Sequence, residues 1–190
     1  TNGYYPDSPP VHYCPPTAAH HRALEAVLEL LRECLPTAHA AMTGWVQRIL
    51  LVQGALLSGS SPRFFGCILM PVERFNQPPA MLAGDLLHEL AHQELFLLNA
   101  YDRLVQPAGD NVWRFSIFAG VRRPTMGRLH VAHAIFRMLQ VPRAANQRSL
   151  LLRAQLWKTS RSFRKGELTP LGEAIVRDVY RAAYLPRIMA

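Results

Sequence analysis

The residues best suited to metal chemistry are two histidines and a glutamate in the stretch His88-Glu89-Leu90-Ala91-His92. An α-helix turns about 100° per residue, so His88 and His92 would project from one face, one turn apart. Two imidazoles in that arrangement can hold one divalent metal ion, and Glu89 beside them can handle protons. A match of five residues often occurs by accident, so the surrounding sequence has to support a metal site.

The surrounding stretch favours a long, buried helix. Pro78 and Pro79 are typical of a helix start, and helix-compatible sequence continues to about Tyr101. Apolar residues that could form its buried side are Met81, Leu82, Leu86, Leu90 and Phe96. Two neutral imidazoles and a carboxylate on a buried helix are costly unless they bind something, so the context predicts a metal site.

Two histidines leave a metal ion short of ligands, so a third ligand is expected downstream. No glutamate lies between Glu94 and Glu167. The remaining candidates are Asp102, Asp110, His130 and His133. The two histidines are one turn apart in an apolar helical stretch that can return antiparallel to the metal helix. That helix completes the site most simply, and we favour His130.

The ligand types leave the metal open, because neutral imidazoles bind Fe(II), Zn(II) or Cu(II). With Zn(II), Glu89 would be the general base for a bound water whose pKa is lowered toward ~7. With Fe(II) and 2-oxoglutarate, the far carboxylate of the co-substrate would need a cation, most simply an arginine. Arg123 and Arg137 lie seven residues to either side of His130, and both can share its helical face if the helix extends that far.

The elements that must position these residues make a mostly helical α+β fold. Helices are predicted over 18–35, 39–46, 79–101, 124–140, 146–162 and 169–184. Strands are predicted over 48–52 and 64–70, a loop over 59–62, and a short strand or coil over 113–118. We expect a zincin-like arrangement in which the small sheet packs on the metal helix. Residues 64–70 could form an edge strand to which an extended peptide adds.

Length and composition indicate one domain. The chain has 190 residues, 49% of them hydrophobic, which is enough to bury one sizeable core. We expect a single metalloenzyme domain over 18–190 after an irregular, proline-rich arm over 1–17. The chain begins with Thr1 and shows no signal peptide, which is compatible with a fragment excised from a longer protein. It contains no apolar run long enough for a membrane span, so no membrane association is expected.

The three cysteines and the positive charge say less about function than the histidines do. Cys34 and Cys67 fall in helical and strand patterns typical of core thiols, and with Cys14 they lack zinc spacing, so a reducing cytoplasm is expected. The net charge is +8, and the densest basic run extends from Lys158 to Lys165. Basic patches can bind nucleic acid or an acidic peptide. No nucleic-acid motif accompanies the charge, so no nucleic-acid partner is expected, and a GC-rich genome also produces such a composition.

Several motifs resemble those of the HExxH-motif peptide-modification proteins found with ribosomal peptide natural products. They are Leu87 to Gln93, Trp113-Arg114, Arg122-Arg123-Pro124, Gly127 to His130, and Leu168 to Gly172. The resemblance covers roughly Arg48 to Ile188, while the shorter N-terminus and the additional His133 depart from it. It implies a non-haem iron, 2-oxoglutarate-dependent β-hydroxylase acting on a precursor peptide, with His88, His92 and His130 as the metal ligands.

Three functions therefore follow from the sequence. The first is iron- and 2-oxoglutarate-dependent peptide hydroxylation, which rests mainly on the resemblance. The second is a zinc metallopeptidase, which rests on the chemistry of His88, Glu89 and His92 alone. The third is a non-catalytic peptide-binding module with a structural metal.

Overall fold

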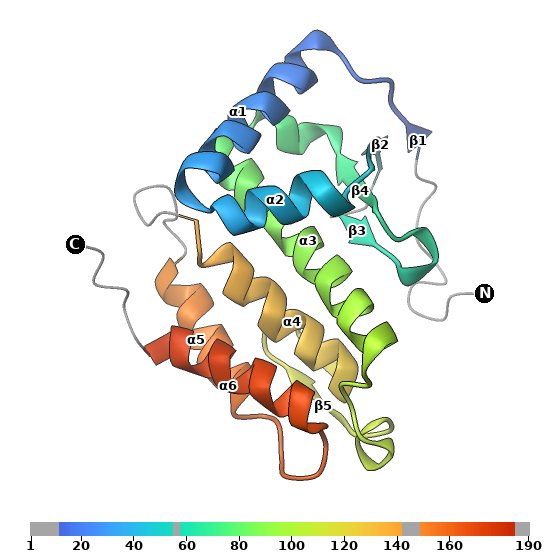
Figure 1. Cartoon of the computed structure of the whole chain (residues 1–190), viewed down its shortest axis with the longest axis vertical. Coiled ribbons are helices and arrows are strands. Elements are labelled where there is room, and N and C mark those ends of the chain that lie inside the picture. Colours follow the sequence, from blue (N-terminus) through green and yellow to red (C-terminus); the bar gives the residue numbers. More distant parts are fainter. Residues whose placement is uncertain (1–11, 55–57, 142–148, 185–190) are drawn as a thin grey trace.

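The structure of the chain, a computed structural model, describes residues 12–54, 58–141 and 149–184. Its helices are α1 (Ala18–Cys34), α2 (Pro36–Trp45), α3 (Pro79–Tyr101), α4 (Thr125–Met138), α5 (Ser149–Ser160) and α6 (Pro170–Tyr184). Its strands are β1 (His12–Tyr13), β2 (Arg48–Gln53), β3 (Gly59–Ser60), β4 (Cys67–Pro71), β5 (Trp113–Ser116) and β6 (Val121–Pro124). Short 3-10 turns are η1 (Pro62–Phe64), η2 (Val72–Asn76) and η3 (Pro107–Gly109). The predicted α+β fold, mostly helical with a small sheet, is confirmed (Figure 1).

Helix α3 has the sheet, α1 and α2 on one side and α4, α5 and α6 on the other (Figure 1). Its predicted bounds, 79–101, are confirmed, and Pro79 occupies the first turn, where a missing N–H costs nothing. Its fully buried leucines are Leu82, Leu86, Leu87, Leu90 and Leu95. A helix that is buried on most faces must find partners inside the protein for its polar side chains.

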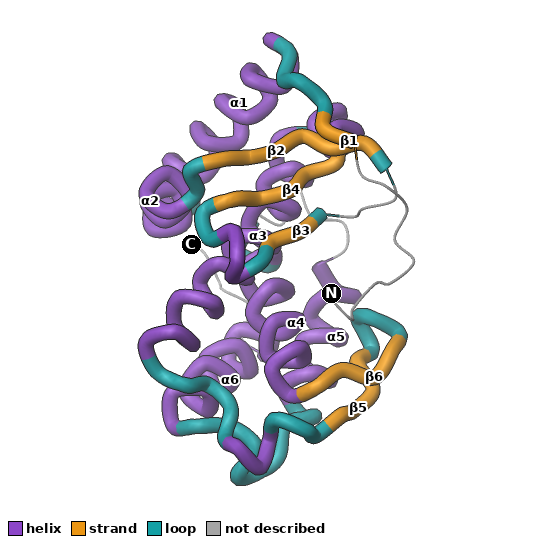
Figure 2. Tube along the Cα trace, turned by 90° about the vertical axis from the view of Figure 1, so that its right-hand side faces the viewer, coloured by secondary structure: helices purple, strands orange, loops and turns teal. Residues whose placement is uncertain are grey.

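A four-stranded sheet packs on the first half of α3, with strand order β1-β2-β4-β3 (Figure 2). β2 and β4 are parallel, whereas β1 and β3 are antiparallel to their neighbours. Leu51, Ile68 and Met70 of this sheet join leucines of α3 in one buried cluster. Gln93 of α3 adds a polar link, because its side chain donates to the carbonyl of Cys67 at 3.0 Å.

Helices α4, α5 and α6 and the hairpin β5–β6 lie on the other side of α3 (Figures 1 and 2). Leu95 of α3 and Leu129 of α4 meet in one buried cluster. Ile135 of α4 and Val179 of α6 share a second cluster. Because α4 carries His130, this packing determines where that imidazole lies relative to α3.

The predictions about the strands are partly wrong. The sequence predicts a loop over 59–62, but Gly59–Ser60 form β3 and pair with Leu69 and Ile68 of β4. The sequence predicts a strand from residue 64, but β4 begins at Cys67, after turn η1. β4 also lies between β2 and β3, so it is not an edge strand. An extended peptide therefore cannot add to it along its whole length.

Other differences concern the N-terminal region and the cysteines. His12–Tyr13 lie within the predicted irregular arm but form β1 against β2, while residues 1–11 lie outside the described residues. Cys34 is exposed rather than in the core, and all three cysteines are free. Residues 146–148, the expected start of a helix, also lie outside the described residues. No helix in the described ranges combines the length and apolar character that crossing a membrane requires.

Candidate metal centre

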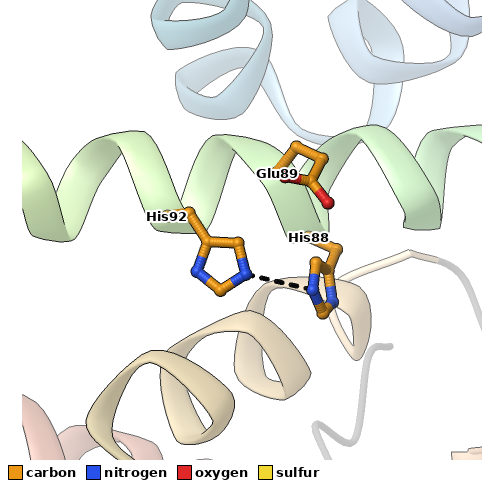
Figure 3. Close-up of side chains that lie close together, drawn as sticks. All are labelled: His88, Glu89 and His92. Atoms are coloured by element: carbon orange, nitrogen blue, oxygen red, sulfur yellow. Dashed lines mark hydrogen bonds between the residues drawn. The ribbon is translucent and has the colours of Figure 1, made fainter. Parts of the chain in front are cut away.

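His88, Glu89 and His92 of α3 form a cluster whose ligand atoms all lie within 4.8 Å of one another. Nε2 of His88 is 3.1 Å from Nε2 of His92, and both imidazoles lie on the same side of α3 (Figure 3). Two nitrogens each ~2.0–2.1 Å from one ion are separated by about 3 Å when they are neighbouring ligands. The two rings are therefore arranged to share one metal ion.

His130 of α4 lies against the other edge of His92. The Nδ1 atoms of the two rings are 2.9 Å apart, and the ring centroids are 5.0 Å apart. One nitrogen of His92 thus faces His88, and the other faces His130. A histidine that binds a metal through one nitrogen commonly hydrogen-bonds through the other. His130 lies beside the group of His88, Glu89 and His92 rather than within it, and in this arrangement it is placed to orient His92.

All three imidazoles favour their neutral form. Burial lowers the pKa of His88 and takes the pKa of His92 well below its ordinary value. Burial, followed by the charges of His133 and Arg123, lowers the pKa of His130 to about 4. Because a metal binds the neutral imidazole, these rings need not lose a proton at neutral pH. Each of the three residues is half-buried, so part of each remains exposed to solvent.

Glu89 is held by two serines of the segment around β3. Its side chain is 1% exposed. Ser60 donates to one carboxylate oxygen at 2.6 Å, and the Ser58 hydroxyl donates to the other. Burial raises the pKa of Glu89, and the two serine hydrogen bonds oppose that rise. Neither serine is predicted as functional, because a Gly-Ser-Ser run is typical of a loop and no local signal links it to α3.

Glu94 links α3 to α4 just beyond the metal cluster. It accepts a hydrogen bond from Nε2 of His133 at 2.7 Å, and Arg137 donates to both of its oxygens, from Nε at 2.8 Å. Burial raises the pKa of Glu94, but the hydrogen bonds from His133 and Arg137 outweigh burial and leave the pKa lowered. His133 and Arg137, both predicted as candidate site residues, are therefore already paired with this carboxylate.

The two aspartates proposed as alternative ligands lie away from the cluster. Asp102 follows the end of α3 and is exposed, about 15 Å further along the helix axis than His92 at ~1.5 Å per residue. Asp110 is exposed and forms an ion pair with Arg103. Of the four candidates for a third ligand, His130 is the one in contact with the cluster.

Arg123 brings a positive charge to the site. It lies in β6, not on the helical face expected from its spacing to His130. Burial is the main cause of the low pKa of His92 and His130, and the charge of Arg123 contributes to both. Its Nε is buried and has no hydrogen-bond partner among the described residues. The Nε atoms of Arg114 and Arg128 also lack a partner in the part of the chain that the structure describes, so this donor is compatible with a bound acidic group but does not by itself indicate one.

The hairpin β5–β6 also places an apolar surface next to the site. The ring of Phe118, in the turn between its strands, stacks on His88 with centroids 6.3 Å apart. Gly120, with φ of 67°, takes the left-handed conformation that this turn requires. Other exposed apolar residues of the hairpin are Trp113, Phe115, Ile117 and Val121. The sequence motifs did not predict this surface.

Arg128 of α4 supports the hairpin from inside the protein. It is fully buried and donates to Glu167 at 2.9 Å and to the carbonyl of Ser162 at 2.8 Å. Arg114 of β5 binds the other oxygen of Glu167 at 2.5 Å, and the guanidinium of Arg128 lies 4.8 Å from the centre of the Phe163 ring. This network ties the hairpin that carries Arg123 to α4 and to the segment before α6.

No protein-family model matches this chain, and no curated protein matches it. The chemistry of the cluster and the motif resemblance are therefore the grounds on which a function can be proposed.

Proposed function

We propose that the protein is a non-haem iron, 2-oxoglutarate-dependent hydroxylase that installs a β-hydroxyl group on a side chain of a ribosomally made peptide. His88, His92 and His130 would hold Fe(II), and Arg123 would bind the far carboxylate of 2-oxoglutarate. When bound, iron and 2-oxoglutarate supply, with dioxygen, the oxidising power that converts a C–H bond into C–OH. The motif resemblance to HExxH-motif peptide-modification proteins supports the same activity.

The charge and the position of Arg123 beside the histidines are the observation on which this proposal depends most. Its buried Nε lacks a partner among the described residues, and its charge reaches His92 and His130. A dicarboxylate co-substrate needs such a cation, because a guanidinium can bind a carboxylate through two parallel hydrogen bonds. Attack of water on a peptide carbonyl has no comparable need. Arg137, the other candidate cation, already pairs with Glu94.

The remaining residues of the site have roles that follow from their contacts. The Glu94–His133 and Glu94–Arg137 pairs hold α4 against α3, which keeps His130 beside His92. Phe118 covers one side of His88 and offers an apolar surface to an incoming side chain. The packing of a small sheet on the HExxH helix supports a zincin-like arrangement.

A zinc peptidase is the second candidate, because the Glu89 carboxylate belongs to the same cluster as the two imidazoles. A general base must direct an oxygen at the water that it deprotonates. Both oxygens of Glu89 already accept serine hydroxyls, and its side chain is buried. These contacts favour an orienting role for Glu89 over proton abstraction.

A mass measurement separates the two activities. The apoprotein is loaded anaerobically with Fe(II) or Zn(II) and then incubated in air with ascorbate, 2-oxoglutarate and precursor peptides encoded beside its gene. Hydroxylation leaves the peptide uncut and adds one oxygen, about 16 Da, only with iron and 2-oxoglutarate. Conversion of 2-oxoglutarate to succinate without a peptide provides a readout that does not depend on choosing the substrate. Cleavage with zinc that needs neither oxygen nor 2-oxoglutarate would contradict the proposal.

A further inference from the structure

An open hollow lies between α5, α6 and the segment that joins them. Its volume is about 360 Å³, which lies within the usual range for small ligand pockets, ~300–1,000 Å³. α5 and α6 lie side by side (Figure 1), and none of the residues proposed for the metal centre lines the hollow. Its chemistry therefore calls for a separate explanation.

The rim of this hollow is positively charged. Arg164, Lys165 and Arg177 line it, and all three are exposed. None of them forms an ion pair with an acidic residue in the part of the chain that the structure describes. Glu173 is the one acidic residue among the lining residues. The basic run noted in the sequence thus meets a third cation from α6 around one hollow.

The floor of the hollow is apolar and fixed by the core. Leu168 lines it and belongs to a buried cluster that includes Leu95 of α3, and Val176, which also lines it, packs against that cluster. Phe163 also lines it, with one face covered by the guanidinium of Arg128. A surface with an apolar floor and a cationic rim matches a ligand that carries both apolar groups and carboxylates.

We propose that this hollow binds a peptide segment in which acidic side chains alternate with apolar ones. The apolar side chains would rest on Leu168 and Val176, and the carboxylates would meet Arg164, Lys165 and Arg177. The proposal rests on the hollow and goes beyond the proposed function, since it holds whether or not the metal centre hydroxylates a peptide.

Two features favour a peptide over a nucleic acid. A single-stranded nucleic acid needs a positive groove that follows several phosphates, with aromatic faces on which the bases stack. Here the three cations surround one compact hollow rather than line a groove that could follow several phosphates. Phe163 cannot offer both of its faces, because Arg128 covers one.

Fluorescence anisotropy with a short labelled peptide of glutamate, leucine and serine tests the proposal. The full chain should bind this peptide, and matched peptides with lysine in place of glutamate, or serine in place of leucine, should bind at least tenfold more weakly. Arg164→Ala combined with Arg177→Ala should weaken binding by about tenfold, or ~1.4 kcal/mol, because two exposed ion pairs are lost together. His92→Ala should leave this binding unchanged, which separates the test from that of the metal centre.

The matched control combines Arg161→Ala with Arg181→Ala, which removes the same charge outside the hollow. Arg161 lies over the Trp157 ring, and Arg181 pairs with Asp178. Lys165→Glu provides a second variant should the double variant misfold, as judged by circular dichroism. Absence of binding, an equal loss in the control, or tighter binding of a single-stranded oligonucleotide that the same variants weaken would overturn the proposal.

Discussion

The imidazoles of His92 and His130 meet through their Nδ1 atoms at 2.9 Å, although they come from two different helices. His92 therefore directs one nitrogen at α4 and keeps the other, Nε2, 3.1 Å from His88. A metal ion held by the Nε2 atoms of His88 and His92 leaves two roles for His130. In the arrangement described, His130 lies at the opposite edge of His92 and can orient that ring by a hydrogen bond; as the third ligand it would need its ring, or that of His92, to turn toward the ion. The two roles predict different losses of metal affinity.

We expect His130→Ala and His130→Asn each to lower the affinity for Fe(II) or Zn(II) as much as His88→Ala does. Removing any one of three imidazole ligands leaves an incomplete site. Isothermal titration of the apoprotein under anaerobic conditions measures the affinity. Loss of an orienting group typically costs only about 10- to 100-fold. A loss within that range for both His130 variants, smaller than for His88→Ala, would make His130 an orienting residue and move the third ligand elsewhere.

Arg123→Ala should raise the dissociation constant of 2-oxoglutarate by about 10- to 100-fold without removing the metal. A hydrogen bond to a charged group contributes ~1.5–3 kcal/mol, and ~1.4 kcal/mol corresponds to a factor of ten. Arg123→Lys should recover only part of the affinity, because an ammonium cannot form the two parallel bonds. Titration of the iron-loaded protein without oxygen measures both variants.

The control for Arg123 is its neighbour Arg122, which is exposed and donates to the carbonyl of Trp113 at 2.9 Å. Arg122→Ala removes the same charge from the same strand and should change 2-oxoglutarate affinity by less than about threefold. Equal effects of the two variants would indicate a general electrostatic contribution and remove Arg123 from its proposed role.

Arg137→Ala should destabilise the fold rather than act on the co-substrate alone. Glu94 would stay buried with one of its two partners removed, and breaking a buried pair in this way costs about 3–5 kcal/mol. Urea denaturation of the metal-free protein measures this loss. Glu94→Gln combined with Arg137→Met, which leaves no unpaired charge, should be more stable than Arg137→Ala alone. Wild-type stability of Arg137→Ala, with weak 2-oxoglutarate binding, would return Arg137 to the co-substrate role.

The Glu167 network should make stability depend on acidic pH. Burial raises the pKa of Glu167, but hydrogen bonds from Arg114 and Arg128 outweigh burial, so the pKa is lowered from its ordinary value of 4.5. A carboxyl with a lowered pKa stabilises the fold above its unfolded pKa, and this contribution is lost as the pH falls through the folded pKa. The Glu167→Gln variant should therefore have a lower free energy of unfolding than the wild type. The difference between the two should be largest at neutral pH.

Urea denaturation between pH 3 and pH 7 follows this difference, which should shrink below a pH of about 4.5. Glu29→Gln is the control, since Glu29 pairs with Arg32 on an exposed face of α1. That variant should change stability little at any pH. A difference for Glu167→Gln that stays constant with pH would show that ionisation of this carboxyl does not stabilise the fold.

Local signals explain which parts of the structure could be predicted from the sequence. Pro79 and the spacing of the leucines after it act within one segment, so the bounds of α3 were predictable. β3 depends instead on pairing Gly59 and Ser60 with β4, and two residues carry no strand signal of their own. The sequence did not predict β6 either. Its last residue, Pro124, is typical of a helix start, so the pattern predicted a helix there instead of the end of a strand.

The candidate site also has some features that local sequence signals predict and others that they do not. The spacing of His88 and His92 on one helix is a local property, and the contact between His92 and His130 needs only that α4 returns beside α3. The partners of Glu89 and Arg128 are distant in sequence, so no motif points to Ser58, Ser60 or Glu167. Burial of Arg128 was not foreseen, because an arginine on a helix is usually exposed.

Glu89→Gln decides whether this carboxylate moves a proton in the reaction. A glutamine of the same shape can keep hydrogen bonds to Ser58 and Ser60, so the variant should fold and bind metal like the wild type. If Glu89 only orients the site, iron-loaded Glu89→Gln should retain at least about a tenth of the rate of succinate formation. A general base contributes 10²–10⁴-fold, so its loss would reduce the rate far more. With zinc and a peptide, the same variant would abolish cleavage in a peptidase. A loss of at least about a hundredfold in succinate formation, with unchanged affinity for metal and 2-oxoglutarate, would give Glu89 a direct role in proton transfer.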